Sequence, residues 1–242
     1  MRKIQHIVSS VIILYDELTG RPVKNDIFTV TDQSGKKALY KDNGIYVFTG
    51  DYSCLMDIDI NSQWYQNKRV QIKMNPGGMI SRIWMMPSVK NPGLSQVTVL
   101  TGTAAPNVEI KFIVCTDESG YRLLQELDTG DDSVNIYHLP YDYIQGRTFR
   151  IADNDTEKHE DIELDGESGY NRFLLKTPAK MMHIPEKSFV YRITRINADD
   201  TGEYLAVFRN IPVCGSRCII ETDGKVHETD LKYNQLQRCE IG

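Results

Sequence analysis

The sequence of 242 residues has no long apolar run. The run nearest the N-terminus, residues 11–15, is far shorter than the about 20 residues that a membrane-spanning helix needs. Residues 1–10 mix polar and apolar side chains, and no small-residue cleavage site follows them. We therefore expect neither a signal peptide nor a membrane partner, and we expect the chain in the cytoplasm or in a particle assembled there.

Cysteine is scarce, and its number is odd. The five residues form no even framework of spacings, so we expect reduced thiols that are mostly buried. They are Cys54, Cys115, Cys214, Cys218 and Cys239.

A zinc site would need four nitrogen or sulfur ligands in a tetrahedron, and Cys214, Cys218, His227 and Cys239 are the candidate set. Structural zinc sites usually pair their ligands as C-x2-C or C-x4-C. Here three residues separate the first pair, and the second pair is spread out. This spacing favours packed thiols and a surface histidine, so we expect no metal.

Basic residues are outnumbered, 28 against 33, which gives a net charge of −5. Residues 1–88 hold 11 basic and 8 acidic residues, a net of +3, and the remainder holds 17 and 25, a net of −8. An acidic balance argues against nucleic acid as a partner, because such binding depends on basic contacts to phosphate. The opposite signs would favour head-to-tail stacking of copies; ordinary surface scatter is the alternative.

Catalytic motifs are missing as well. The five histidines are scattered, and no nucleophile elbow, zinc-protease helix, phosphate-binding loop or dinucleotide fingerprint occurs. Asp57 and Asp59 share a strand face, but alternation explains them as the solvent side of that strand. We therefore expect a protein that is not an enzyme and that holds no cofactor.

Short β-type runs separated by turn residues fill the first 88 residues. Branched and aromatic residues favour strands at 11–15, 27–31 and 45–48, with turns at 32–35 and 42–44. Residues 54–60 and 70–74 alternate between apolar and polar, which is typical of half-buried antiparallel strands. With the closing strand at 79–86 we count about seven strands, which predicts a β-sandwich.

The turn residues of this region carry a family resemblance. Their order resembles that of the carboxypeptidase-regulatory-like (transthyretin-related) β-sandwich, a module that is generally a non-catalytic structural or binding unit. Its enzymatic relatives, the hydroxyisourate hydrolases, carry a C-terminal Tyr-Arg-Gly-Ser motif; this sequence ends in Arg-Cys-Glu-Ile-Gly, so that activity is not carried over. The matching residues are Asp16, Thr19, Gly20, Pro22, Val23, Thr31, Asp32, Gly35, Gly44, Tyr46 and Pro87.

Residues 88–93 mix proline, glycine and polar residues and mark a boundary between modules. Beyond it, Leu100-Thr101-Gly102 echoes Leu18-Thr19-Gly20, and residues 117–120 echo residues 32–35, which suggests either a duplication or two similar hairpins. Further strands are predicted at 108–114, 134–139, 148–152, 161–164, 172–176, 189–196, 204–208, 218–221 and 225–227, and short helices at 119–127 and 230–236.

Three other features suggest binding. The acidic run 153–161 could supply calcium ligands, but it lacks the spacing of a calcium loop and has the composition of a solvated hairpin tip. Aromatics in or beside loops could stack on sugars or anchor an interface, or they could plug the ends of sandwiches. Met181 and Met182 mark a Met-rich strand end. The loop aromatics are Trp64, Tyr65, Tyr137, Tyr141 and Tyr143.

The sequence therefore predicts an all-β fold of tandem antiparallel β-sandwich modules. Residues 1–88 are the transthyretin-like sandwich, and residues 94–242 are a second β-rich domain, divided into a related sandwich (94–180) and a β-hairpin region (186–242). The predicted function is that of a structural or adaptor subunit of a larger assembly, such as a phage-like or contractile-injection particle. A carbohydrate-binding or adhesion module is the alternative.

The predicted partners are other protein subunits, among them copies of the same chain, with carbohydrate as the alternative ligand. Trp84, Met85 and Met86 end the closing strand just before the boundary, and Met and aromatic side chains are enriched in interface cores. We expect these three residues in a contact with a neighbouring subunit; packing between the two modules of one chain is the competing interpretation.

Overall fold

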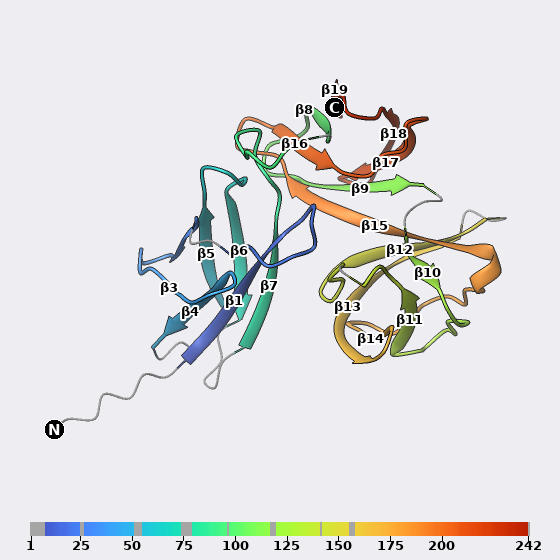
Figure 1. The fold of residues 1–242 in the computed structure, drawn as a ribbon, viewed down its shortest axis with the longest axis horizontal. Coiled ribbons are helices and arrows are strands. Elements are labelled where there is room, and N and C mark those ends of the chain that lie inside the picture. Colours follow the sequence, from blue (N-terminus) through green and yellow to red (C-terminus); the bar gives the residue numbers. More distant parts are fainter. Residues whose placement is uncertain are drawn as a thin grey trace. The chain divides into compact units, whose positions relative to one another are not determined.

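The chain folds almost entirely into β-strands (Figure 1). The computed structural model describes residues 8–24, 27–50, 55–73, 79–95, 97–116, 120–140, 142–154 and 158–241. It divides into two compact units, residues 1–95 and 96–242. None of the described residues lies in an α-helix, so none forms a helix that could cross a membrane.

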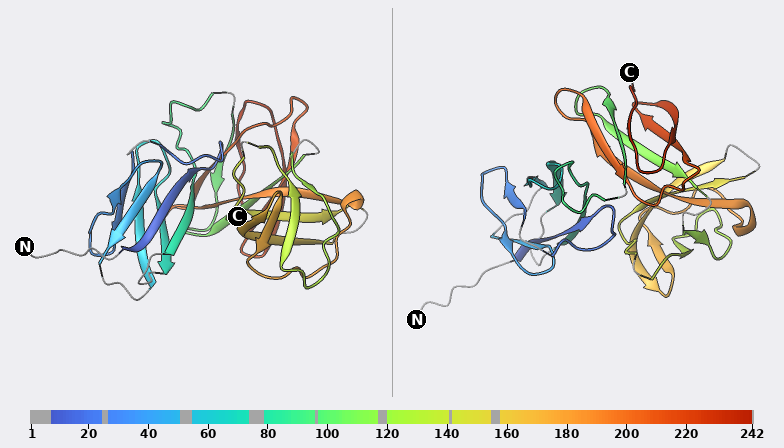
Figure 2. Two further views of the ribbon diagram at one scale, coloured as in Figure 1. Left: turned by 60° about the horizontal axis from the view of Figure 1, so that its bottom comes forward. Right: turned by 45° about the horizontal axis from the view of Figure 1, so that its top comes forward.

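The first unit is a sandwich of two sheets, coloured blue to teal in Figures 1 and 2. One sheet has the strand order β3-β4-β1-β7, and the other has the order β2-β5-β6. All pairs are antiparallel except β1 with β7, which is parallel. The strands are β1 (Val8–Asp16), β2 (Thr29–Asp32), β3 (Leu39–Tyr40), β4 (Ile45–Thr49), β5 (Leu55–Asn61), β6 (Lys68–Lys73) and β7 (Met79–Met85).

One apolar core lies between these two sheets. Alternate residues of each strand point into it, among them Ile12 and Leu14 of β1 and Ile58 and Ile60 of β5. The turn before β4 fits against this packing because it has a glycine. A side chain at Gly44 would meet the carbonyl oxygens of Val23 and Leu14 at 2.7 and 2.8 Å, and its φ of +70° suits glycine.

The second unit is built on one nine-stranded sheet, in the order β10-β11-β14-β13-β12-β15-β9-β17-β18. A three-stranded sheet, β16-β8-β19, accompanies it. The elements are β8 (Thr98–Thr103), β9 (Glu109–Cys115), β10 (Arg122–Leu123), β11 (Ser133–Tyr137), β12 (Thr148–Asp153), β13 (His159–Gly169), β14 (Arg172–Leu175), the 3-10 helix η1 (Pro185–Lys187), β15 (Ser188–Asn197), β16 (Glu203–Phe208), β17 (Ser216–Thr222), β18 (Lys225–Leu231) and β19 (Leu236–Arg238).

Strands β10 to β15 curl around a core of their own, which we call the curled half. Strand β13 pairs with β12 through its first part and with β14 through its second, and its register shifts at Gly166 and Gly169 let it bend. Each strand of the half sends side chains into this core, for example Phe149 of β12, Phe173 of β14 and Val190 of β15.

The remaining strands form the layered half, in which β9, β17 and β18 face the β16-β8-β19 sheet. Phe112 of β9 packs against Tyr204 and Phe208 of β16, with ring centroids 5.8 and 5.7 Å apart. Strand β15 belongs to both halves, because residues 188–193 pair with β12 and residues 193–197 pair with β9. The two halves of this unit therefore share one continuous sheet.

The predicted all-β fold is confirmed, with the addition of two parallel pairs, β1 with β7 and β8 with β19. The two predicted short helices are wrong. Strand β10 occupies part of residues 119–127, of which residue 119 lies outside the described residues. Residues 230–236 hold the end of β18 and the start of β19. The subdivision at 180–186 also needs correction, because β8 and β9 pair with strands from β15 onward.

The echo of the two Leu-Thr-Gly segments is not structural. Gly20 lies in a turn with a φ of 67°, whereas Gly102 lies inside strand β8. A Cβ atom at Gly102 would lie 1.7 Å from the carbonyl oxygen of Cys239, so this glycine permits the close approach of the C-terminal segment. The other echo cannot be compared, because residues 117–119 lie outside the described residues. Neither a duplication nor the transthyretin-related resemblance gains support here, and the latter stays a prediction.

Candidate functional site

The outer face of the β3-β4-β1-β7 sheet is apolar. Cross-strand partners lie on the same face of a sheet, and the register places Leu39, Val47, Val11 and Ile80 in one row across the four strands. We call this surface the apolar face. Its residues are Val11, Ile13, Leu39, Ile45, Val47, Ile80 and Trp84, with Arg82 as the charged member.

This face is apolar because β1 carries no alternation in its centre. Ile12 and Leu14 point into the core of the unit, and Val11 and Ile13 lie on the opposite side of the same strand. A strand that is apolar on both sides is typical of a sheet covered on both faces. Leu39 and Ile80 are nevertheless 54% and 53% exposed.

Arg82 lies in the middle of the apolar face, beside Ile13. Its Nε atom is buried and has no hydrogen-bond partner. Burying a guanidinium nitrogen without an acceptor costs free energy, and the described residues supply no acceptor for this nitrogen.

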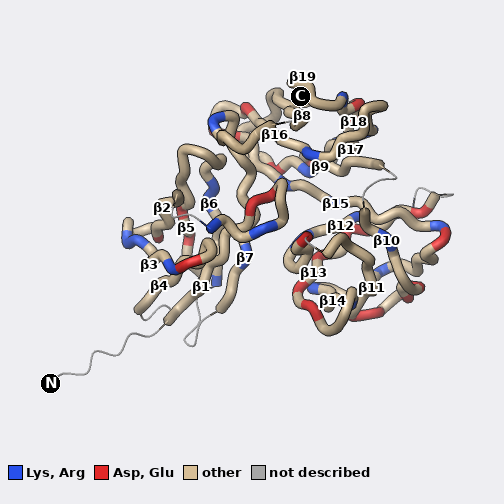
Figure 3. Tube along the Cα trace, in the orientation of Figure 1, with Lys and Arg blue, Asp and Glu red and all other residues tan. Residues whose placement is uncertain are grey.

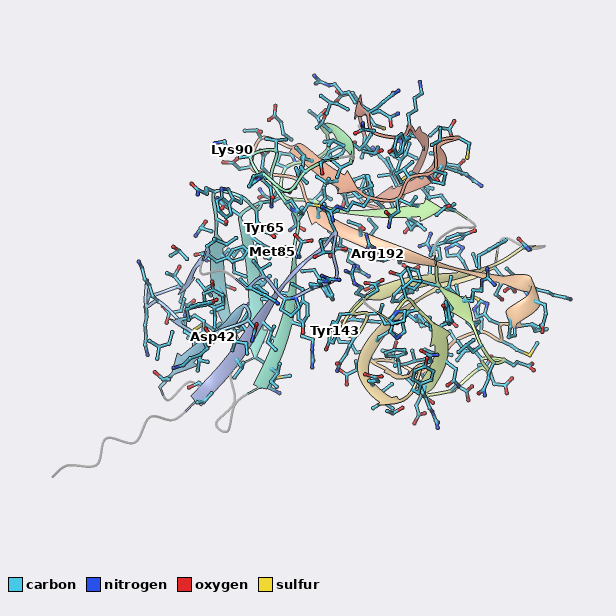
Figure 4. All side chains as sticks on the ribbon, viewed as in Figure 1. Asp42, Tyr65, Met85, Lys90, Tyr143 and Arg192 are labelled. Atoms are coloured by element: carbon cyan, nitrogen blue, oxygen red, sulfur yellow. The ribbon has the colours of Figure 1, made fainter. Side chains whose placement is uncertain are left out.

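The three predicted interface residues do not share one face. Met85 is fully buried and belongs to the core of the first unit together with Tyr65 (Figure 4), so it cannot form a subunit contact. Met86 is buried too. Trp84 is half-buried on the apolar face, where its ring lies 4.8 Å from that of Tyr15. Trp84 thus remains the candidate for an interface.

The opposite outer face, that of β2-β5-β6, is polar. Arg69 pairs with Asp57 at 3.4 Å and with Asp59 at 3.7 Å, as expected for the solvent side of an alternating strand. We call this surface the polar face. Its residues are Thr31, Leu55, Asp57, Asp59, Arg69, Gln71 and Lys73.

The candidate zinc ligands are not brought together. Cys214 is exposed and Cys218 is fully buried, and the described residues contain no group of three or more histidine, cysteine or acidic side chains placed to hold a metal ion. Burial raises the pKa of the Cys218 thiol, so this cysteine is a packed core residue rather than a reactive one.

The acidic run 153–161 is not simply a solvated hairpin tip, although residues 155–157 lie outside the described residues. Asp153 Oδ1 accepts hydrogen bonds from Ser188 Oγ at 2.8 Å and lies 2.9 Å from Nδ1 of His183. Glu160 accepts from the backbone N–H of Lys180 at 2.9 Å and lies 3.3 Å from Nε2 of His183. The His183 side chain is fully buried between these two carboxylates.

This arrangement of Ser, His and Asp is not catalytic. A nucleophilic serine must hydrogen-bond to the histidine that takes its proton, whereas Ser188 and His183 both contact the same oxygen of Asp153. Burial on its own would raise the pKa of Asp153, but the hydrogen bonds from His183 and Ser188 outweigh it and lower the pKa. The group fastens the segment before β15 to β12 and β13.

A second charged cluster lies on the nine-stranded sheet. Arg150 of β12 donates to both carboxylate oxygens of Glu221, at 2.6 and 3.0 Å, and to Asp161 at 2.8 Å. Lys111 lies 3.4 Å from Asp161. Burial would lower the pKa of Arg150, but the hydrogen bonds to Glu221 and Asp161 raise it. Because β15 and β9 lie between β12 and β17, the sheet must curve for these side chains to meet.

Most of the loop aromatics are not free for binding. Tyr65 is buried and donates to Asp16 Oδ2 at 2.7 Å, Trp64 packs against the core, and Tyr143 donates to Gln145. Tyr141 lies outside the described residues. Tyr137 is 41% exposed, while Tyr170, which the sequence analysis missed, is 91% exposed between β13 and β14. Met181 and Met182 are exposed as well.

No protein-family model matches the chain, and no curated protein matches it. Several solved structures are similar to it. The Bacillus anthracis TIE protein is matched with 9% identity and a TM-score of 0.28, over 98% of this chain and 51% of that protein, so this chain spans about half of its length.

Two further solved structures are similar over nearly their whole length. The shaft pilin SpaA of Lactobacillus rhamnosus GG is matched with 9% identity and a TM-score of 0.24, over 98% of this chain and 97% of the pilin. A "putative carbohydrate binding protein" from Bacteroides uniformis is matched with 12% identity and a TM-score of 0.28, over 93% and 97%. These values are too low to transfer a function.

Proposed function

We propose that the chain is a non-enzymatic interaction module, a structural or adaptor subunit that binds another protein through the apolar face of its first unit. The observation that carries the proposal is that strand β1 is apolar on both sides while Leu39 and Ile80 of the same sheet are exposed. Exposed apolar patches on folded proteins commonly mark interaction sites.

The energetics of burial support this use of the face. Moving one Leu, Ile or Val side chain from water into an apolar contact is worth about 1.5–3 kcal/mol when it is complete. The six aliphatic side chains of the apolar face therefore provide a driving force for binding. Trp84 adds an aromatic residue of the kind that anchors interface cores.

The finer form of the proposal is a subunit of a phage-like or contractile-injection particle, made in the cytoplasm. It rests on fold-level analogy, and a fold hosts many functions. Co-purification of the chain with sheath, tube or baseplate proteins would support this form. A carbohydrate-binding module is the second candidate, and the exposed Tyr170 between β13 and β14 is the observation in its favour, because aromatic rings stack on sugars.

Site-specific crosslinking in the native cell tests the interaction module. A photo-crosslinking amino acid is placed at Ile80 on the apolar face and, as the matched control, at Leu55 on the polar face, where the side chain is 59% exposed. We expect a crosslinked protein species from position 80 and little from position 55. Equal crosslinking at both positions, or none at position 80, would contradict the proposal.

A further inference from the structure

We propose that the protein bound by the apolar face is a second copy of this chain, and that Arg82 receives a carboxylate from the second unit of that copy. The inference rests on the proposed function, because it names the partner of the same face. The described residues give two reasons for it, the charges of the two units and the unpartnered nitrogen of Arg82.

The two units carry opposite charges. Residues 1–95 hold twelve basic and eight acidic residues, a net charge of +4, and residues 96–242 hold sixteen and twenty-five, a net charge of −9. Figure 3 shows acidic segments recurring along β13. Complementary charge steers two surfaces together within about one Debye length, which is about 8 Å at physiological salt. The second unit of another copy is therefore an electrostatically matched partner for the first unit.

Arg82 defines what the partner must present at the centre of the contact. The Nε atom of Arg82 is already without an acceptor, and a purely apolar partner would bury the rest of the guanidinium without supplying one, which opposes binding. A carboxylate accepts two parallel hydrogen bonds from an arginine. The partner surface that fits is thus apolar around at least one aspartate or glutamate.

A symmetric contact between two apolar faces does not fit. In a twofold contact the same patch occurs on both sides, so two Arg82 side chains would enter one apolar interface and neither would bring an acceptor. A contact between the first unit of one copy and the second unit of the next avoids this clash of charges. Such a head-to-tail contact can repeat, and it builds a ring or an open chain of subunits.

Sedimentation of the purified full-length chain tests the inference, over a range of protein concentrations and at low and high salt. We expect the average mass to rise beyond that of a dimer with concentration and to fall with added salt. Ile80→Glu should weaken association about tenfold or more, because it places a charge inside the contact. Leu55→Glu is the matched control on the polar face and should associate like the wild type.

The Arg82→Met variant tests the contribution of the charge to association, because it removes the guanidinium and keeps an apolar side chain. We expect weaker association with a smaller dependence on salt, at an unchanged melting temperature of the first unit followed by tryptophan fluorescence. A chain that stays monomeric at every concentration, a mass that stops at the dimer, or equal weakening by Leu55→Glu would overturn the second copy as partner. A monomer that still crosslinks to a different protein at position 80 would leave the proposed function standing.

Discussion

The first unit exposes apolar side chains on one face of a sheet, whereas the second unit encloses an arginine and a histidine together with their carboxylate partners. On the first unit, Leu39 and Ile80 are more than half exposed, and the pairs of Arg69 lie in solvent on the polar face. In the second unit the Arg150 side chain is 6% exposed, and the His183 side chain is fully buried. The first unit thus places apolar side chains in solvent, and the second unit places charged or polar side chains in its interior. Both placements cost free energy.

The difference indicates that the exposed apolar side chains and the enclosed ion pairs have different roles. Exposed apolar side chains gain free energy only when something covers them, as the proposed binding role of the first unit requires. Buried ion pairs add little to stability, because desolvation offsets their attraction, but they require specific partners at specific positions. In the second unit they fix which strands approach one another on the curved sheet. The first three of the four predictions that follow test this difference.

Removing a buried cation should have the largest effect. Arg150→Ala removes the buried cation of the cluster and leaves Glu221 and Asp161 with the more exposed Lys111 alone, and we expect a loss of about 3 kcal/mol in the unfolding free energy of the second unit. Both tryptophans, Trp64 and Trp84, lie in the first unit. Circular dichroism should therefore report the loss while tryptophan fluorescence does not.

The control for Arg150 is Arg69→Ala on the polar face. Its two ion pairs are exposed, so we expect a change of about 1 kcal/mol or less. Equal effects of the two substitutions would remove the distinction between enclosed and exposed charge.

Neighbouring residues of β1 should separate stability from binding. Ile12 is fully buried in the core, and Ile12→Ala should cost about 2–5 kcal/mol, because it leaves a cavity. Ile13→Ala, on the apolar face, should cost less stability and should weaken association instead. Tryptophan fluorescence melts and sedimentation of both variants measure the two effects. A larger loss of stability from Ile13→Ala would place the apolar face inside the fold.

Acid should weaken the second unit through Asp153 and Asp161. Burial would raise the pKa of Asp161, but Arg150 and Lys111 outweigh it, and the pKa values of both carboxyls lie below their usual range. Their contribution to stability is complete above the unfolded pKa of about 4 and is lost as the pH falls through the lower folded pKa. We expect Asp161→Asn to reduce the change in melting temperature between pH 5 and pH 2, measured by circular dichroism. An unchanged pH dependence of the melting temperature would show that Asp161 does not contribute to the loss of stability in acid.

The smallest effect is expected from the cysteines. All five thiols should titrate in denatured, non-reduced protein, and elemental analysis should find no zinc. Cys214→Ser, at an exposed position, should leave the melting temperature unchanged. Stoichiometric zinc that disappears in this variant would reverse the expectation.

Much of the strand pattern was predictable from local residues. The turn at Asn43 and Gly44 adopts the positive φ angles that its residue types favour, and so does the hairpin turn at Asp223 and Gly224. Strand β8 was missed because Gly102 resembles a turn residue. Its real role depends on the approach of Cys239, which lies far along the chain.

The candidate site was only partly predictable. Period-two alternation already implies that Trp84 and Met85 point to opposite faces, so grouping them in one interface contradicted the strand pattern itself. The apolar run at 11–15 signalled a sheet covered on both faces, but which strands flank it follows from pairing and not from sequence order. His183 gave no local signal, because Asp153 and Glu160 lie more than twenty residues before it.

The sharing of β15 between the two halves of the second unit has a consequence for synthesis on the ribosome. Strands β8 and β9 are the first of the second unit to emerge, but among the described residues β9 pairs with β15 and β17 alone, so residues 116–187 must be made before it finds a partner. Contacts between distant residues form slowly, and unpaired strand edges are prone to aggregate. The curled half can assemble its neighbouring strands in the meantime. Strand β15, the last strand of the curled half, then offers β9 an edge to pair with. The second unit therefore folds from its middle outward.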